Sequence, residues 1–413
     1  MKRVVITGMA GFSPIGNDWQ TISKNLRSSN TGIRYMESWE RHKELETRLG
    51  APVMDFEKPE HFSRKQIRSM GRVALMATVA TERALADAGL LSNTIIPEIT
   101  DGRMGISYGS SAGSTDALIN ICNMILDHPS PDRGINANSY LKAMSHTTAV
   151  NIGIFFSLKG RIIPTSSACT SGSQGIGYAY EAIKYGHQDL MVSGGGEELC
   201  PTEAAVFETL YATSARNDAP ESTPRPFDKD RDGLVIGEGA ATLILEERER
   251  AIRRGATIHA EIIGFGTNSD GAHITQPQAE TMYRALALAL EQSGLRAQDI
   301  GYVSAHGTAT ELGDIAESQA TNRLLGSNMP ISAFKSFTGH TMGACGALEA
   351  MVAIQMMNQG WFHGTANLDN LDPHCAKLDY LTGEGREIET RFVMSNNFAF
   401  GGINTSLIFA KES

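Results

Sequence analysis

Short apolar runs alternate with longer helical patterns along this chain, and glycine-rich turns separate them. Val4-Val-Ile leads into Thr-Gly8, Val303-Ser-Ala leads into His306-Gly, and Ile331-Ser-Ala-Phe leads into Lys335. Buried strands that alternate with helices are typical of α/β proteins, which often carry polar functional groups where their strands end. The pattern therefore predicts an α/β fold with short buried strands.

The two halves of the chain carry faint echoes of each other. Ala84-Leu-Ala-Asp-Ala-Gly89 precedes an apolar run from Met104, and Ala289-Leu-Glu-Gln-Ser-Gly294 precedes one from Ile300. Each pattern is a helix that ends at glycine and leads into a short buried strand. A second echo pairs Ala168-Cys169 with Ala344-Cys345, each opening a helix rich in glycine and alanine. The echoes predict a duplicated α/β unit.

Composition indicates a large enzyme-like interior. The chain has 413 residues, of which 41% are hydrophobic, enough for more than one simple core. No apolar run approaches the ~20 residues of a membrane span, so none is predicted. Five cysteines, an odd number without a CxxC pair, predict reduced thiols in the cytoplasm and no metal site. No linker divides the chain, so we predict two halves of one unit, residues 1–255 and 256–413.

The net charge of −10 argues against a nucleic-acid partner, and an acidic protein partner would need a local basic patch. Such a patch lies in the segment 63–72, where Arg64, Arg68 and Arg72 follow one another at helical spacing with Lys65 beside them. From the residues alone, this segment is either a solvated helix face or a docking site.

Cys169 is the most reactive candidate in the chain. It lies in Pro164-Thr-Ser-Ser-Ala-Cys-Thr-Ser-Gly-Ser-Gln, directly before a helical pattern over Gly175–Lys184. A sulfur at a helix N-terminus is favoured as thiolate, because it faces unpaired N–H groups and the positive end of the dipole. The small neighbours leave room for an acyl group. Taken alone, a cysteine among small residues is more often a buried structural thiol.

Two histidines strengthen the catalytic interpretation. His306 follows an apolar strand in Ala-His-Gly-Thr-Ala-Thr310, and His340 closes Lys335-Ser-Phe-Thr-Gly-His before the helix that begins near Met342. Each lies in a loop of small residues at the end of an apolar run. One cysteine and two such histidines form a nucleophile-and-base set.

At this point the chain resembles a known family. The motifs around Cys169, His306 and Lys335–His340, together with Pro226–Gly239 and Asn397-Phe-Ala-Phe-Gly-Gly-Ile-Asn, are similar to those of the elongating β-ketoacyl-acyl carrier protein synthases of Cys-His-His type. The five motifs stand in the family's order and the resemblance covers essentially the whole chain. It implies the thiolase fold, with five layers in the order helix, sheet, helix, sheet, helix.

The resemblance also implies roles for individual residues. Cys169 would hold the acyl chain, with the N–H groups of Cys169 and Phe400 as the oxyanion hole. His306 and His340 would stabilise an enolate, Lys335 would supply a positive field, and Glu349 would anchor Lys335. The remaining implied residues bind or gate the substrate: Thr308 and Thr310 on the pantetheine arm, Phe400 and Gly401 at the gate. No cofactor is implied, and by the pseudo-symmetry Cys345 would be a packing residue.

The partners are implied in the same way. Ketosynthases of this type dock an acidic acyl carrier protein on a basic helix, which the patch of Arg64, Lys65, Arg68 and Arg72 resembles. Arg216 is similar to a second contact. The resemblance further implies a dimer, either with a second copy or with a chain-length-factor homologue.

Several alternatives compete with this interpretation. The opening Gly8 and Gly11 suggest a nucleotide-binding turn, but the third glycine is missing and Pro14 blocks helix entry. A thiolase would need a second cysteine as base where this chain offers histidines, and a chain-length factor would lack the nucleophile. Within the family, the phrases Ile163–Gln174 and Asn396–Ser406 look most like the aryl polyene branch. Housekeeping fatty-acid elongation is the second choice.

Overall fold

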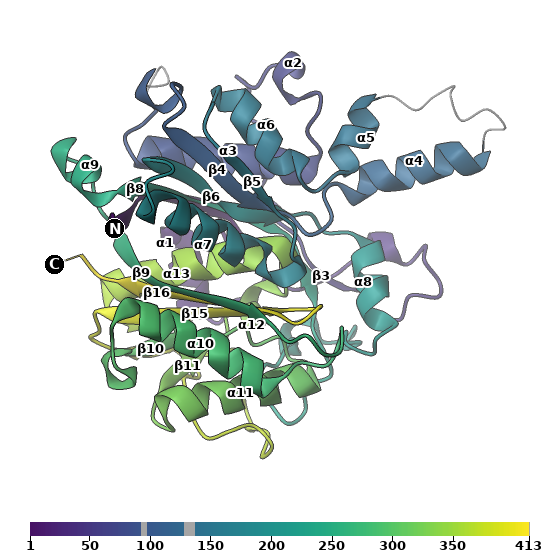
Figure 1. The fold of residues 1–413 in the computed structure, drawn as a ribbon. Coiled ribbons are helices and arrows are strands. Elements are labelled where there is room, and N and C mark those ends of the chain that lie inside the picture. The colour runs from purple at the N-terminus through teal and green to yellow at the C-terminus, as the bar shows by residue number, and fades with distance from the viewer. Residues whose placement is uncertain (92–96, 128–136, 413) are drawn as a thin grey trace.

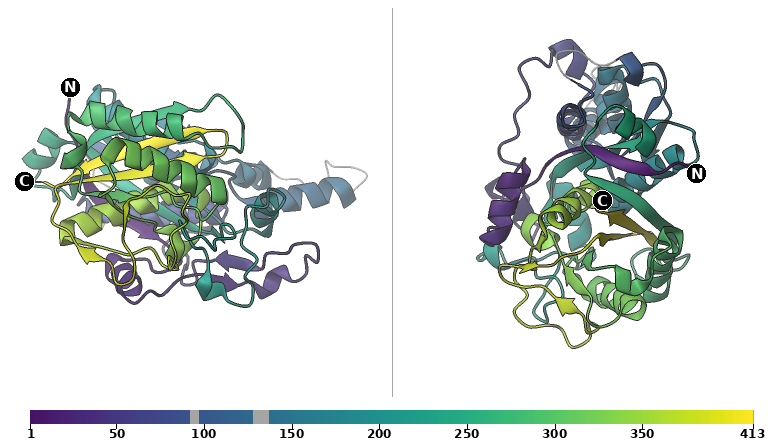
Figure 2. Two further views of the ribbon diagram at one scale, coloured as in Figure 1. Left: turned by 90° about the horizontal axis from the view of Figure 1, so that it is seen from below. Right: turned by 90° about the vertical axis from the view of Figure 1, so that its left-hand side faces the viewer.

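The computed structural model describes residues 1–91, 97–127 and 137–412. Its elements form five layers, helix, sheet, helix, sheet, helix, as the resemblance implies (Figure 1). The two ends of the chain lie on the same side of the molecule (Figure 2). Within the described ranges, no helix has both the length and the apolar character needed to cross a membrane.

The N-terminal half forms a sheet in the order β5-β4-β6-β8-β1. β4 pairs in parallel with β5 and β6, whereas β8 runs antiparallel to β6 and β1. β6 is buried along its whole length because helices cover both faces of the sheet. The strands are β1 (Val4–Phe12), β4 (Met104–Gly109), β5 (Ile162–Thr165), β6 (Leu190–Glu197) and β8 (Gly239–Glu247).

The C-terminal half repeats this arrangement in the order β11-β10-β15-β16-β9, with the same alternation of parallel and antiparallel pairs and with β13 added at the edge. A short antiparallel pairing between β1 and β9 joins the halves. The predicted duplication is therefore confirmed. The strands are β9 (Ala260–Ser269), β10 (Tyr302–Ser304), β11 (Pro330–Ser332), β13 (Asp379–Tyr380), β15 (Phe392–Ala399) and β16 (Ile403–Ala410).

Two helices form the middle layer between the sheets, α7 (Ser171–Lys184) and α13 (Cys345–Gln359). Their backbones approach closely: a Cβ added at Gly172 would lie 2.9 Å from the Ala347 nitrogen, and one at Gly346 would lie 2.7 Å from the Ser173 nitrogen. Only glycine allows this approach. It brings the N-termini of the two helices together at the point where Cys169 lies.

Four helices form the outer layers. They are α3 (Arg72–Asp87) and α6 (Thr147–Phe156) over the first sheet, and α10 (Ala279–Ser293) and α11 (Glu311–Leu325) over the second. As predicted, Gly89 and Gly294 end α3 and α10 with positive φ angles, and each helix leads into a buried strand.

The remaining elements connect or extend these layers. Figure 1 shows α4 and α5 reaching away from the body of the molecule. The helices are α1 (Trp19–Arg27), α2 (Arg64–Ile67), α4 (Thr115–Asp127), α5 (Ala137–Ala143), α8 (Pro201–Glu208), α9 (Arg248–Arg253) and α12 (Lys335–Thr338). The short strands are β2 (Arg34–Tyr35), β3 (Leu49–Ala51), β7 (Ile236–Gly237), β12 (Trp361–Phe362) and β14 (Arg386–Glu387).

The sequence echo that paired Cys169 with Cys345 is wrong, because the equivalent positions in the structure differ from it by two residues. Cys169 is the middle residue of a 3-10 turn before α7, and Gly343 has the same place before α13. Both turns begin with a non-glycine residue at positive φ, Ala168 and Met342. The structure thus aligns Cys169 with Gly343, because the shared backbone turn, rather than the repeated letters, carries the symmetry.

Candidate active site

Cys169 lies in the tight turn that joins β5 to α7, and its side chain is buried. Ser171 holds the turn: its hydroxyl donates to the Ala168 carbonyl (2.7 Å) and accepts from the Ser167 N–H (2.9 Å). Ala168 has a φ of 49°, a left-handed conformation that costs energy for a residue with a Cβ. The helix begins at Ser171, earlier than the pattern over Gly175–Lys184 predicted.

His340 contacts the cysteine directly. Its Nε2 lies 3.0 Å from the Cys169 Sγ, and its Nδ1 accepts a hydrogen bond from the Met342 N–H at 3.1 Å. A ring nitrogen that accepts from a backbone N–H carries no proton. The neutral His340 therefore bears its proton on Nε2, directed at the sulfur.

His306 reaches the same point from the end of β10. Its Nδ1 faces the Lys335 ammonium at 3.0 Å and the Asn397 amide NH2 at 3.4 Å, both hydrogen-bond donors. Its proton is therefore on Nε2 as well. Cys169, His306 and His340 each place one ligand atom within 4.8 Å of the others. The sequence placed these three residues in separate loops, and the fold brings them together.

Both histidines are held in the neutral form. Burial lowers the pKa of each ring well below the usual 6.5, and the positive charge of Lys335 lowers it further. Two neutral imidazoles that each present an N–H to one small space can stabilise a developing oxyanion there.

Lys335 and Glu349 form a buried ion pair behind His306. The Lys335 ammonium also donates to the His306 carbonyl oxygen at 2.8 Å, and the Asn397 amide donates to the second Glu349 oxygen at 2.6 Å. Lys335 begins the short helix α12, whereas the sequence pattern placed it at the end of a strand. This network fixes the His306 ring and its tautomer.

Two buried carboxylates on α11 hold the loop that carries His306. Glu317 accepts the N–H groups of His306 (2.7 Å) and Gly307 (2.8 Å), and Asp314 accepts those of Thr308 (3.1 Å) and Ala309 (3.2 Å). Glu317, Asp314 and Asn397 are positioning residues that were not predicted from the sequence. For Asp314 and Glu317, the available signal was an acidic pair three residues apart on the helix that follows the His-Gly-Thr loop.

The electrostatic state of Cys169 differs from the expectation. Burial raises the pKa of its thiol to about 11, against the charge of Lys335 and the N–H groups of Phe400 and Cys169, which lower it. Desolvation thus outweighs the helix start, and the thiol form prevails at neutral pH. The same two N–H groups, directed at the sulfur, are those predicted for the oxyanion hole.

A cavity of about 480 Å³ leads from the surface to these groups, with Cys169, His306 and His340 in its lining. Thr308 and Thr310 also line it, and their hydroxyls hydrogen bond to each other at 2.9 Å. The Phe400 ring stacks on Phe207 with centroids 5.0 Å apart. Gly401 and Gly402, the next two residues, have positive φ angles and form the turn between β15 and β16.

The predicted docking residues divide into two groups. Arg64, Lys65 and Arg68 are exposed, and none forms an ion pair with a described residue. Arg72 instead binds both oxygens of Glu238 (2.7 and 2.8 Å), and Arg216 pairs with Asp232 at 3.2 Å.

The spacing of the arginines predicted one continuous helical face over 64–72, and this prediction is wrong. α2 ends at Ile67, and Gly71 precedes a new helix that begins at Arg72. Arg72 therefore does not continue the face of Arg64 and Arg68, and its charge is balanced by a buried carboxylate.

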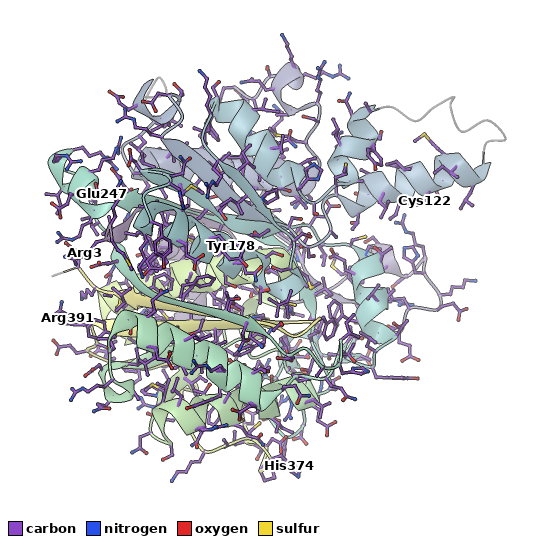
Figure 3. All side chains as sticks on the ribbon, in the orientation of Figure 1. Arg3, Cys122, Tyr178, Glu247, His374 and Arg391 are labelled. Carbon is purple, nitrogen blue, oxygen red and sulfur yellow. The ribbon has the colours of Figure 1, made fainter. Side chains whose placement is uncertain are left out.

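The other cysteines are placed differently from Cys169. The Cys345 thiol is buried and donates to the Cys169 carbonyl oxygen at 3.2 Å, as part of the packing between α7 and α13. Cys122 is exposed on α4, the helix that reaches away from the body of the molecule (Figure 3).

Comparison with known proteins agrees with this geometry. The β-ketoacyl synthase N-terminal domain matches residues 1–251 and the C-terminal domain matches residues 259–369. The chain is 37% identical to 3-oxoacyl-[acyl-carrier-protein] synthase 2 of Vibrio cholerae and 36% identical to synthase 1 of Escherichia coli, over 99% or more of every chain involved.

Solved structures show the same relationship. A β-ketoacyl synthase from Burkholderia phymatum superposes with a TM-score of 0.97 at 57% identity, and the ishigamide ketosynthase/chain length factor with 0.90 at 30%, both over the full length of each chain. The chain belongs to the β-ketoacyl synthase family and has its thiolase-like fold. It is a 3-oxoacyl-acyl carrier protein synthase, an acyltransferase that condenses with decarboxylation.

Proposed function

We propose that this enzyme elongates aryl or polyenoyl chains with malonyl units, each chain held as a thioester on Cys169 and delivered by an acyl carrier protein. The observation that carries the chemistry is the pair of neutral histidines, each with an Nε2–H and a ring nitrogen within 4.8 Å of the nucleophile.

The first half-reaction is acyl transfer. The Cys169 sulfur attacks the carbonyl carbon of the carrier thioester. The N–H groups of Cys169 and Phe400 stabilise the negative charge that develops on the carbonyl oxygen. The pantetheine sulfur then leaves as a thiol and carries away the proton of the Cys169 thiol.

The second half-reaction forms the carbon–carbon bond. Malonyl carrier protein enters the cavity, and its carboxylate leaves as CO2, giving an enolate whose oxygen accepts the Nε2–H groups of His306 and His340. The enolate carbon then attacks the acyl-Cys169 carbonyl, and the Cys169 thiolate leaves. Because both Nδ1 atoms already accept hydrogen bonds, the histidines act as donors and not as bases toward the thiol.

The carrier protein would dock on the exposed cations Arg64, Lys65 and Arg68, which lie on and just after α2. Arg216 would add a weaker contact because Asp232 already balances part of its charge. We include a dimer in the proposal, with a second copy or with a chain-length-factor homologue, since the ishigamide ketosynthase is paired with such a factor.

Charge reversal at Arg64, Lys65 and Arg68 is expected to raise the apparent KM for acyl carrier protein and to flatten its salt dependence, because exposed charges attract through screened fields. Turnover with a small pantetheine thioester should stay nearly constant. Steady-state kinetics with both substrates check this. Arg391→Glu, an exposed site far from α2 in Figure 3, is the matched control. If activity fell equally with both substrates, the three residues would support the structure of the enzyme and would not bind the carrier protein.

The pathway part of the proposal is supported by the phrases Ile163–Gln174 and Asn396–Ser406, which look most like the aryl polyene branch. The second candidate is ordinary fatty-acid elongation. It is favoured by the 36–37% identity to the 3-oxoacyl synthases 1 and 2 over their full length.

Aryl or polyenoyl carrier proteins are expected to be elongated faster than saturated chains of equal length. The proposed pathway implies a long, straight acyl pocket. A conjugated chain is already extended and would lose little conformational entropy in such a pocket, whereas a saturated chain would lose the freedom of its rotamers there. Competition assays with paired carrier proteins measure the ratio. A preference for saturated medium or long chains, with full activity as a homodimer, would contradict this proposal and support ordinary fatty-acid elongation.

A further inference from the structure

Glu203 is a buried carboxyl group to which the catalytic steps give no role. It lies on α8, only 8% of its surface is exposed, and neither carboxyl oxygen has a hydrogen-bond partner. An isolated polar group in the interior is costly, so proteins seldom keep one without a use. Nearby glutamates are different: Glu197 accepts the Ser111 and Gly343 N–H groups, and Glu238 binds Arg72.

The position of Glu203 connects it to the active site. Phe207 lies one helical turn further along the same face of α8, lines the cavity of Cys169, and stacks on Phe400. Ala204 and Phe207 belong to one apolar cluster with Met342, two residues after His340, and Phe400 packs against this cluster. Glu203 itself does not line that cavity; it lies one helical turn from Phe207, whose ring stacks on the predicted gate residue Phe400. An acyl chain on Cys169 that extended past Phe207 would therefore approach Glu203.

The charge around Glu203 determines its form. Burial raises its pKa well above the usual value, and the neighbouring carboxylates of Glu197, Glu198 and Glu238 raise it further. Arg72, paired to Glu238, is the one cation in an ion pair with this group of four glutamates among the residues described. A protonated carboxyl offers one donor and one acceptor, which together match a hydroxyl group.

Resting on the proposed function, we infer that Glu203 determines specificity by hydrogen bonding a hydroxyl group carried by the acyl chain at a distance from its thioester. An alcohol or a phenol would supply the same chemistry. A site with a buried polar group favours the substrate that pairs with it and rejects the analogue that leaves it unpaired.

The test compares self-acylation rates at Cys169 by mass spectrometry. Carrier proteins are loaded with ω-hydroxyacyl chains of increasing length and with a para-hydroxyaryl chain, each beside its unsubstituted parent. The wild-type enzyme is expected to acylate at least about tenfold faster with the hydroxylated member of one or more pairs, the scale of a single good hydrogen bond. The pair with the largest ratio identifies the alkyl or the phenolic source.

Variants separate specificity from packing. Glu203→Met should remove the preference, accelerate the unsubstituted chain and leave the melting temperature unchanged or higher. Glu203→Gln, which keeps both polar functions, should retain part of the preference. Glu221→Met, at an exposed glutamate, is the control and should behave as wild type.

Three results would overturn the inference: no hydroxyl preference in the wild type at any chain length, an equal ratio in Glu203→Met, or a stronger preference for an amine-terminated chain. Condensation of the unsubstituted chains with malonyl carrier protein is measured in parallel. Its absence would refute the proposed function, whereas condensation without a hydroxyl preference would refute only the role of Glu203.

Discussion

Cys169→Ala is expected to abolish acyl transfer and condensation, reducing both to the uncatalysed background. The substitution removes the atom that forms the thioester, and the thiol of Cys345, although close, donates to a carbonyl and is directed into the packing of the middle layer. Intact-protein mass spectrometry after incubation with acyl carrier protein measures the adduct. Cys345→Ala is the matched control and should remain acylated, because it leaves the nucleophile in place.

Peptide mapping decides the assignment. An acyl group found on any cysteine other than Cys169 would contradict it, including the exposed Cys122, which reacts most easily on grounds of access alone.

His306→Ala and His340→Ala are expected to lose malonyl decarboxylation by ~10²-fold or more, the scale of removing one oxyanion-hole donor. Both should still self-acylate at Cys169, because neither ring has a free nitrogen to take the thiol proton. Separate assays of CO2 release and of the acyl adduct distinguish the two steps. His374→Ala, an exposed histidine on the outer surface in Figure 3, is the control.

The histidine pKa values add a pH test. Because both pKa values are lowered well below 6.5, the rings keep one proton each throughout the neutral range, and titration of the histidines should leave the rate of decarboxylation unchanged from about pH 6 to 8. The histidines should lower the rate only in stronger acid, where the rings become charged. Equal loss of acylation and decarboxylation in the alanine variants would instead mean that the histidines activate the thiol.

The duplicated fold and the three reactive side chains were predictable from the sequence because local signals and global fold agree. Apolar runs that end in His306 and His340, and small residues around Cys169, follow from strand and turn chemistry. The glycines that end α3 and α10 revealed the duplication.

What the sequence could not give depends on contacts between distant segments. Asn397 on β15 contacts His306 just after the neighbouring strand β10, 91 positions earlier in the chain. Glu238 pairs with Arg72 from 166 positions away, so the charge of Arg72 is not available to the basic patch. The pKa of Cys169 also depends on burial by both halves, which no local pattern reports. The unpartnered Glu203 is visible only once its surroundings are known.

We expect Cys169 to hold the growing chain while His306 and His340 stabilise the enolate that decarboxylation forms. The most direct measurement isolates acyl-Cys169 enzyme free of donor, adds malonyl carrier protein labelled at its free carboxylate, and follows both products by mass spectrometry. We expect stoichiometric loss of the label as CO2, disappearance of the Cys169 adduct, and a carrier-bound β-ketoacyl chain two carbons longer. Retention of the label in the product, or chain growth while the adduct persists, would contradict it.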